Sequence, residues 1–305
     1  MGALLPHGRA AGALGRAEVI DSRGFSPTEA ASGPAPGRRQ RLSLASLVAR
    51  PCASPASVAS INGSTWAQAR TAIEHLVDGG SRDDVYLIQE TRFLTQAAME
   101  TARGWGERNG LNAGFSTCSS TGSSVQAVSS GVGILAATHR GFAPVGQEWG
   151  QHSSRILARR VAFGDLVVVV VSLYLEHSVK VTGMNVDILG ELQTFLNELS
   201  EPFIVGADWN MEPQTLESSW WTRAVGGAVV APPFPTCDGR IYDYFVISAA
   251  LAALGPQVEA LRPATTHPHV PVRLQFSQLG ALATVWTLLQ PRPSTRPRWS
   301  SQRTS

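Results

Sequence analysis

The sequence predicts an α/β (α+β) fold in which layered sheets are covered by helices. The chain has 305 residues, of which 43% are hydrophobic, enough for one large domain or two small ones. The run "LVVVVV" at 166–171 is β-branched and far shorter than the roughly 20 residues of a membrane span, so it predicts a buried strand. Similar apolar runs alternate with segments of helical periodicity, which is typical of sheets buried on both faces.

The first half of the predicted domain alternates strands and helices. "SVASI" predicts a short strand. Trp66, Ile73 and Leu76 then recur at helical spacing, and either Ser64 or Thr65 is suited to cap the helix. "DVYLIQE" predicts a strand that ends in a carboxylate, "TQAAMETARGW" a helix, and "SGVGILAA" a strand after a polar loop.

The second half continues the same alternation. "RILARRVAF" and "LVVVVVSLYL" predict two strands joined at Gly164-Asp165. Ile188, Leu192, Phe195 and Leu199 mark one apolar face of a helix. "PFIVGADWN", "IYDYFVIS" and "VPVRLQF" predict three more strands.

The two ends differ in composition from the domain predicted at 56–277. Residues 1–50 are rich in Ala, Gly, Pro and Arg and predict a disordered or low-complexity extension, with an organelle transit peptide as the alternative. Residues 278–305 predict a basic, mostly disordered tail. Within 57–277 there are 14 basic and 20 acidic residues, so the net positive charge of the chain comes from its ends. A nucleic-acid-binding core usually shows a basic face, so this balance weakens the nucleic-acid hypothesis without removing it.

The cysteines and the hydropathy pattern indicate the compartment. Cys52, Cys118 and Cys237 are widely spaced and form no CxxC pair, which argues against a disulfide framework or a thiolate zinc site. A reducing, intracellular setting fits best, either nuclear or cytoplasmic. No apolar run predicts a membrane span. We expect a monomer.

Several predicted strands end in a polar functional group. These groups are Glu90 after "VYLIQ", Tyr174 after "VVVVVSL", Asp208 and Asn210 after "FIVGA", Asp243 within "RIYDYF", and His269 directly before the last strand. Each one alone is more often a turn or loop residue. Side chains at strand ends can nevertheless converge on one rim of a sheet, where ligand sites tend to lie.

The blocks "IQET", "SGVGIL", "VSLYL", "GADWN", "YDYFVIS" and "HVPV" resemble, in order and spacing, the signatures of the endonuclease/exonuclease/phosphatase superfamily. The opening "SINGSTWAQAR", followed by "DDVYLIQET", looks most like the LINE-type retrotransposon or apurinic endonuclease branch. The resemblance covers roughly residues 57–277. It implies a four-layer α/β sandwich, with two packed mixed sheets flanked by helices and an active site on one rim. It also implies a divalent metal, usually Mg²⁺, with Mn²⁺ as a substitute.

The resemblance assigns roles that fit the chemistry of phosphodiester cleavage. That reaction needs an activated water, neutralisation of phosphoryl charge and help for the leaving alkoxide. The roles are metal binding for Glu90 and Asn62, positioning of the water for Asp208, phosphate binding for Asn210, a place near the scissile phosphate for Tyr174, and catalysis for His269 with Asp243 orienting it.

Two positions depart from the family pattern. Ser60 stands where the family has an amide, so only Asn62 keeps the polar character of the first strand's end. His267-Pro268-His269 stands where the family has Ser-Asp-His, and Pro268 has no side-chain donor or acceptor, although His267 has a ring nitrogen. Both changes fall on the metal and phosphate side. We therefore expect weakened metal binding rather than altered acid–base chemistry.

The functional hypothesis is a divalent-metal-dependent phosphodiester hydrolase, a DNA endonuclease-like domain of possible retroelement origin, with another phosphodiester as the open alternative substrate. The candidates for phosphate contacts are Arg92, Arg155, Arg159 and Arg160, each of which could equally be a solvated charge. The alternative function is a catalytically impaired domain kept as a binding module or mobile-element remnant.

Other functional classes find little support in the sequence. The G-x-G-x-x-A match at 131–136 lies in a predicted strand, whereas a dinucleotide fingerprint opens a helix. A zinc site at His267 and His269 lacks further ligands at suitable spacing. No G-x-S-x-G elbow occurs.

Overall fold

A computed structural model describes residues 56–120, 128–262, 264 and 266–276. The predictions for residues 1–50 and 278–305 lie outside the described residues. Within the described part the chain forms two six-stranded mixed sheets and one short two-stranded sheet. The α/β class expected from the sequence is confirmed.

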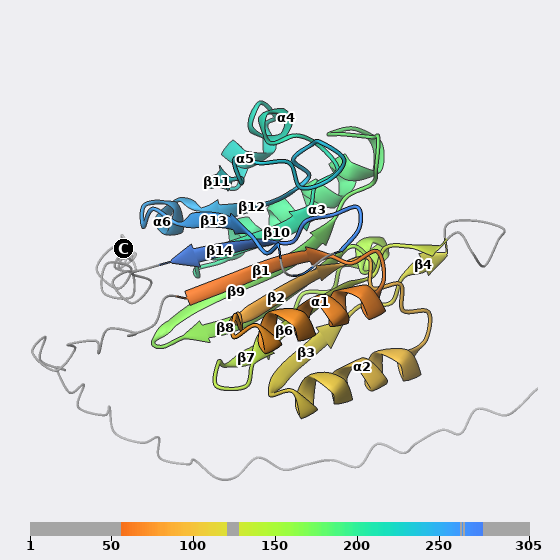
Figure 1. Ribbon diagram of the computed structural model, residues 1–305. Helices are drawn as coiled ribbons and strands as arrows, with labels where there is room; N and C mark the ends of the chain where they lie inside the picture. The colour runs from red at the N-terminus through yellow and green to blue at the C-terminus, as the bar shows by residue number, and fades with distance from the viewer. Residues whose placement is uncertain (1–55, 121–127, 263, 265, 277–305) are drawn as a thin grey trace, which may run out of the picture. The chain divides into compact units, whose positions relative to one another are not determined.

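The two large sheets are built from strands that are not consecutive in sequence (Figure 1). In spatial order the first sheet contains β13 (Gln257–Ala260), β14 (Val272–Phe276), β1 (Ala56–Asn62), β2 (Val85–Gln89), β6 (Val132–Ala137) and β3 (Leu111–Phe115). The second contains β11 (Gly227–Val230), β12 (Asp243–Ser248), β10 (Phe203–Asp208), β9 (Leu166–Tyr174), β8 (Ile156–Phe163) and β7 (Phe142–Pro144). The short sheet pairs β4 (Ser119–Ser120) with β5 (Val128–Ser129).

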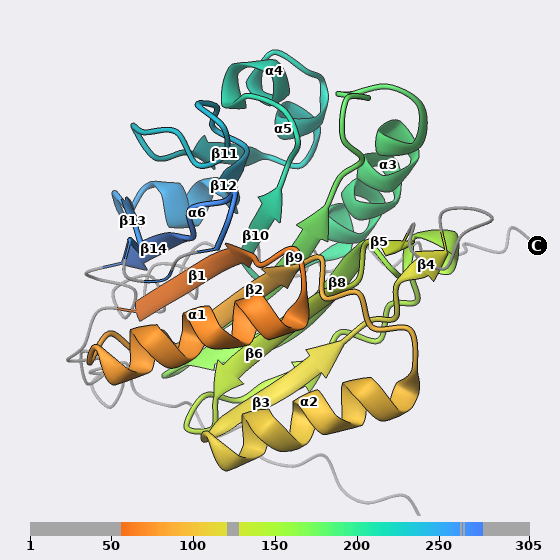
Figure 2. The ribbon, with the colours of Figure 1, turned by 45° about the vertical axis from the view of Figure 1, so that its right-hand side comes forward.

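Helices cover the outer face of each large sheet. The helices are α1 (Trp66–Asp78), α2 (Gln96–Arg108), α3 (Gly183–Glu198), α4 (Pro213–Glu217), α5 (Trp221–Ala224) and α6 (Ala249–Ala252), with a 3₁₀ turn at Gly150–His152. Figure 2 shows α1 and α2 over the first sheet and α3 beside the second. Buried side chains of α1 and α2 pack with those of the first sheet, and those of α3 and α5 pack with the second. A separate apolar cluster lies between the sheets, so the fold is the four-layer sandwich that the resemblance implied.

The alternation of side chains in β9 shows why the sequence folds into these layers. Val168 and Val170 belong to the cluster between the sheets, whereas Val169 and Val171 pack on the side of α3. All four are fully buried. Because successive strand residues point to opposite faces, a strand covered on both sides must be apolar throughout. Each buried valine contributes about 1.5–3 kcal/mol from the apolar area removed from water.

Local signals in the sequence agree with most element boundaries. Thr65 rather than Ser64 caps α1, and its Oγ1 accepts a hydrogen bond from the backbone N–H of Gln68 at 3.3 Å. The "VGILAA" segment is strand β6, which agrees with setting aside the dinucleotide fingerprint. Leu199 differs from the prediction: α3 ends at Glu198, and Leu199 has an extended backbone.

No described helix has the length and apolar character needed to cross a membrane.

Candidate functional site

Strand register places three of the predicted side chains in a row across the second sheet. Asp208, the last residue of β10, pairs with Asp243 at the start of β12 and with Tyr174 at the end of β9. Because β10 is parallel to β9 and antiparallel to β12, the three residues lie at one edge of the sheet. Asn210 follows two residues later, with a left-handed φ of 51°.

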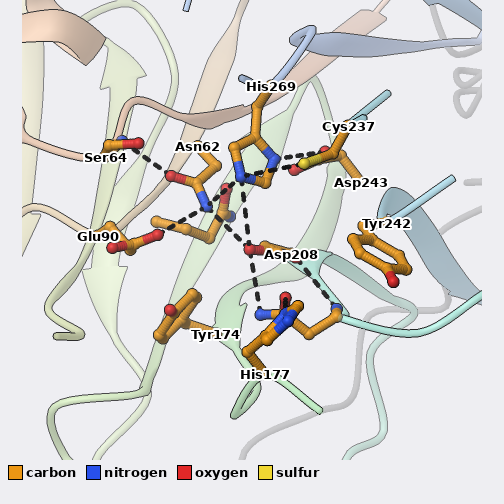
Figure 3. Close-up of polar contacts among 12 residues, drawn as sticks. Asn62, Ser64, Glu90, Tyr174, His177, Asp208, Cys237, Tyr242, Asp243 and His269 are labelled. Carbon is orange, nitrogen blue, oxygen red and sulfur yellow. Dashed lines mark hydrogen bonds and ion pairs between the residues drawn. The ribbon is translucent and has the colours of Figure 1, made fainter. Parts of the chain in front are cut away.

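The first sheet brings three more predicted residues to the same place. Asn62 ends β1, Glu90 follows β2 directly, and His269 lies shortly before β14. Figure 3 shows the side chains of Asn62, Glu90, Asp208 and His269 pointing toward one another. Glu90 has a left-handed φ of 55°, a conformation that non-glycine residues adopt at a cost and that occurs most often at functional sites.

His269 is held by a buried carboxylate. Its Nδ1 lies 2.9 Å from Oδ2 of Asp243, so that nitrogen carries the shared proton and Nε2 faces the cluster. Nε2 lies 3.3 Å from Nδ2 of Asn62, 3.8 Å from Sγ of Cys237 and 4.0 Å from Oδ2 of Asp208. Burial alone lowers the pKa of His269, but the charge and hydrogen bond of Asp243 outweigh it and raise the pKa to about 11. The ring is therefore an imidazolium at neutral pH.

Asp208 sits at the centre of the cluster and is 2% exposed. Its Oδ1 accepts a hydrogen bond from the backbone N–H of Asn210 at 3.0 Å. Its Oδ2 accepts bonds from Nδ2 of Asn62 at 2.9 Å and from Nδ2 of Asn210 at 3.2 Å. Burial and then the charge of Asp243 raise the pKa of Asp208 above the ordinary aspartate range. A carboxylate with a raised pKa accepts a proton more readily than an ordinary one.

Glu90 and Asp208, with the charged ring of His269 beside them, form a group whose carboxylates are suited to a cation. One potential ligand atom from each lies within 4.8 Å of the other two. The Nδ2 group of Asn62 donates to Oε1 of Glu90 at 3.2 Å and also to Asp208, so an uncharged amide joins two buried carboxylates. Hard carboxylate oxygens are the ligands that Mg²⁺ prefers, and a cation would neutralise this pair better than an amide does. The residues therefore fit one divalent cation at Glu90, beside Asp208.

Tyr174 lies beside the carboxylates rather than between them. Its hydroxyl is 3.3 Å from Oγ of Ser129, and the guanidinium carbon of Arg155 lies 5.2 Å from its ring centre. Burial, followed by the charge of Glu90, raises the pKa of Tyr174 well above its usual value. The hydroxyl therefore stays protonated and available as a hydrogen-bond donor at neutral pH.

The cluster opens into a cleft of about 670 Å³. The cleft is also lined by residues that the sequence reasoning missed: His177, Lys180, Cys237, Arg240 and Tyr242. Nδ1 of His177 lies 3.0 Å from Oδ1 of Asn210, which ties a second imidazole to the site. Only closeness in sequence to predicted site residues could have indicated them: His177 follows Tyr174 by three residues, and Tyr242 immediately precedes Asp243.

The two departures from the family pattern have different structural consequences. Ser60 is fully buried below the site, where its Oγ donates to Oε1 of Gln89 at 3.4 Å, and it does not line the cleft. Pro268 does line the cleft and offers no donor or acceptor. His267 is exposed and belongs to neither the cation group nor the cleft lining among the described residues. Of the two departures, only the one at Pro268 can therefore lower the affinity for a metal.

Each of the four arginines suggested for phosphate contacts has another acceptor, which for Arg92 is the site residue Glu90. Nη2 of Arg92 is 2.5 Å from Oε2 of Glu90, and Arg155 forms an ion pair with Glu176. Nη1 of Arg159 donates to a backbone carbonyl at 2.8 Å. Nε of Arg160 lies 2.7 Å from Oε1 of Glu201. None of the four lines the cleft.

Comparison with known proteins agrees with this architecture. A family model described as the Endonuclease/Exonuclease/phosphatase family matches residues 30–294. Members of this family typically depend on divalent metals. No match is found among curated proteins.

Solved structures with low sequence identity share the fold. An AP endonuclease from Leishmania major superposes with a TM-score of 0.55 at 14% identity, covering 73% of this chain and 87% of the other. The endonuclease domain of TRAS1, a telomere-specific non-LTR retrotransposon, gives 0.54 at 13% identity, covering 73% and 98%. The 3′ phosphatase NExo from Neisseria, bound to a product DNA hairpin, gives 0.50 at 14% identity, covering 72% and 99%. Nuclease and phosphatase structures are thus both among the neighbours of this fold.

Proposed function

The chain belongs to the endonuclease/exonuclease/phosphatase family, and on this premise we propose that it is a divalent-metal-dependent phosphodiester hydrolase acting on DNA. The observation that carries the proposal is the buried His269–Asp243 pair, which faces Asp208 and Glu90 at the floor of an open cleft. We propose Mg²⁺ as the metal, with Mn²⁺ as a substitute. The retrotransposon-like opening of the sequence supports a retroelement origin as a further part of the proposal.

The proposed roles follow from protonation and hydrogen bonding. His269 is charged at neutral pH, so its Nε2–H donates to a phosphoryl oxygen as negative charge develops there. Asp208, whose pKa is raised, orients the attacking water and takes its proton. The Nδ2 group of Asn210 donates one hydrogen bond to Asp208 and one to the backbone carbonyl of Leu175. Asn210 therefore positions Asp208 and has no amide hydrogen left to bind the phosphate. Tyr174 supplies a neutral hydroxyl beside the scissile phosphate.

Glu90 would hold the metal beside Asp208, and Asn62, whose oxygen accepts the backbone N–H of Ser64, would position both carboxylates through its Nδ2 group. A divalent cation there supplies charge neutralisation at the phosphoryl oxygens. Pro268 adds no ligand, and Arg92 occupies one oxygen of Glu90, so we expect weak Mg²⁺ binding. Isothermal titration calorimetry beside an intact family member tests this expectation. Affinity as tight as that of the intact member would overturn it.

The function is tested by cleavage of supercoiled plasmid and of an abasic-site duplex in Mg²⁺ or Mn²⁺. We expect cleavage by the native chain and losses of about 10²–10⁴-fold for Glu90→Ala and His269→Ala, the size of a general acid–base or electrostatic contribution. His139→Ala and Glu107→Ala change exposed residues of the same types outside the cleft, so they should retain activity. Equal activity in all four variants would reject the site.

A second candidate is a catalytically impaired domain kept as a binding module or a mobile-element remnant. The absence of a ligand atom at Pro268 favours it, because fewer charged ligands lower metal affinity. The same assay separates the two candidates. DNA binding without cleavage at any Mg²⁺ or Mn²⁺ concentration would favour the binding module over the hydrolase.

A further inference from the structure

Two loops of the second sheet form one wall of the cleft and carry cationic side chains. One loop follows β9 and includes His177 and Lys180; the other precedes β12 and includes Arg240 and Tyr242. The two loops meet beside Asp208, since the rings of His177 and Tyr242 lie edge to face with centroids 6.4 Å apart. Figure 3 shows the Tyr242 ring on the side of Asp208 away from Glu90 and the His177 ring below Asp208.

Lys180 and Arg240 have no carboxylate partner among the described residues, unlike the two arginines beside the cluster. The arginines nearest the cluster, Arg92 and Arg155, are each paired with a glutamate. No ion pair between described residues includes Lys180 or Arg240. Glu212 and Asp238 also line the cleft, but Oε2 of Glu212 accepts a backbone N–H at 3.3 Å and neither carboxylate forms a described ion pair with the two cations. The charge on this wall is therefore available to an anion from solvent.

The structure holds both cationic residues in defined positions. Nη1 of Arg240 donates to the hydroxyl of Tyr242 at 3.0 Å, and its guanidinium carbon lies 6.0 Å from that ring centre, which leaves its other N–H groups without a described acceptor. Lys180 has a left-handed φ of 51°, and its carbonyl accepts a bond from Nδ2 of Asn185 at 2.7 Å. Lys180 is also the only lysine of the chain, against 24 arginines.

The position of these cations indicates what they would bind. The scissile phosphate must lie against His269 and Asp208 at the floor, and a cleft of about 670 Å³ has room for more than one phosphoryl group. A nucleic-acid strand places further phosphates close to the one being cleaved. We propose that Lys180 and Arg240 form a second anion subsite that holds a phosphate next to the scissile one and selects a nucleic-acid strand over an isolated phosphodiester. This inference rests on the proposed function.

Binding of a fluorescent single-stranded oligonucleotide in EDTA tests the subsite without requiring catalysis. We expect Lys180→Gln and Arg240→Gln each to weaken binding about tenfold, the size of one charge-assisted hydrogen bond. Each should also reduce the slope of log affinity against log salt by about 0.7. Arg108→Gln is the matched control, because Arg108 is an exposed arginine of α2 without a described ion-pair partner. Losses no larger than that of the control would overturn the subsite.

Hydrolysis then tests selectivity and separates this inference from the proposed function. On the oligonucleotide we expect kcat/KM losses at least five times larger than on bis(4-nitrophenyl) phosphate, about 1 kcal/mol. Equal losses on both substrates would overturn the subsite while leaving the hydrolase intact. If the native chain cleaves neither of these substrates nor the plasmid and abasic duplex, the hydrolase is rejected, while the binding result still decides the subsite. Faster turnover of an inositol trisphosphate than of the oligonucleotide would overturn the assignment to nucleic acid.

Discussion

Replacing Asp243 with asparagine isolates the contribution of one buried charge to the proposed chemistry. Asp243 lies 2.9 Å from Nδ1 of His269, and its charge and hydrogen bond hold the pKa of His269 at about 11 against the opposing effect of burial. Losing one partner of a buried ion pair costs about 3–5 kcal/mol. Since 1.4 kcal/mol is a factor of ten, the proton affinity of His269 should fall at least about a hundredfold. The ring then loses its proton at much lower pH.

The sign of the pH dependence follows from that change. A histidine pKa raised by folding contributes stability that is fully present below the ordinary value of about 6.5 and is lost as the pH rises through about 11. The difference in unfolding free energy between the native chain and Asp243→Asn should therefore be largest near pH 6 and shrink toward pH 11. If His269 acts as a proton donor, the ratio of variant to native kcat/KM should also fall as the pH rises from 6 to 9.

Imidazole NMR of the metal-free protein in EDTA measures the effect directly. The native His269 should stay charged from pH 5 to 9, whereas His269 in Asp243→Asn should lose its proton within that range. Asp78→Asn, an exposed change on α1, is the control and should match the native titration. Identical titrations in the native chain and Asp243→Asn, or a neutral native His269 at pH 8, would show that Asp243 does not hold the proton on His269.

Three further substitutions test other parts of the structure. Arg92→Gln frees an oxygen of Glu90 and should tighten Mg²⁺ binding several-fold by calorimetry; unchanged or weaker binding would show that Arg92 does not compete with the metal. Pro268→Asp adds an acidic group to the cleft wall and should tighten Mg²⁺ binding about tenfold, because ligand charge sets affinity for such ions; no change would place the affinity limit elsewhere. Arg273→Met leaves the buried Asp83 unpaired and should lower the free energy of unfolding, measured in urea, by about 3–5 kcal/mol. The double variant with Asp83→Asn should recover part of this loss. A loss below about 1 kcal/mol in Arg273→Met would contradict this prediction.

Much of the fold could be predicted because burial on two faces leaves a strong local signal. "LVVVVV" reads as a strand without tertiary information, since each valine is apolar whichever face it meets. The short edge strands β11 and β13 were missed because only one side of each is paired and their residues are half-exposed or exposed. Leu199 was placed in a helix because its spacing is helical, although the chain turns extended there before Pro202.

The candidate site was predictable where a residue ends a strand and unpredictable where it lies on a loop. Asp208 and Asp243 follow from strand ends and register, because a sheet fixes which residues lie side by side. Lys180 follows β9 and Arg240 precedes β12, each on a loop, so their place in the cleft depends on how these two loops meet at His177 and Tyr242. Periodicity carries no information about such loops.

Contacts between the two sheets couple the fold to the site. Each sheet supplies part of the cluster, and two of its close contacts cross between them, from Asp243 to His269 and from Asn62 to Asp208. The spacing of the sheets just below depends on Gly206 of β10, where a Cβ would lie 2.5 Å from Cδ1 of Leu87. Because a packed interior transmits such strain, sheet spacing governs whether His269 and the carboxylates meet. The changes at Ser60 and Pro268 leave both crossing contacts in place, so the proposed acid–base half of the site does not depend on either change.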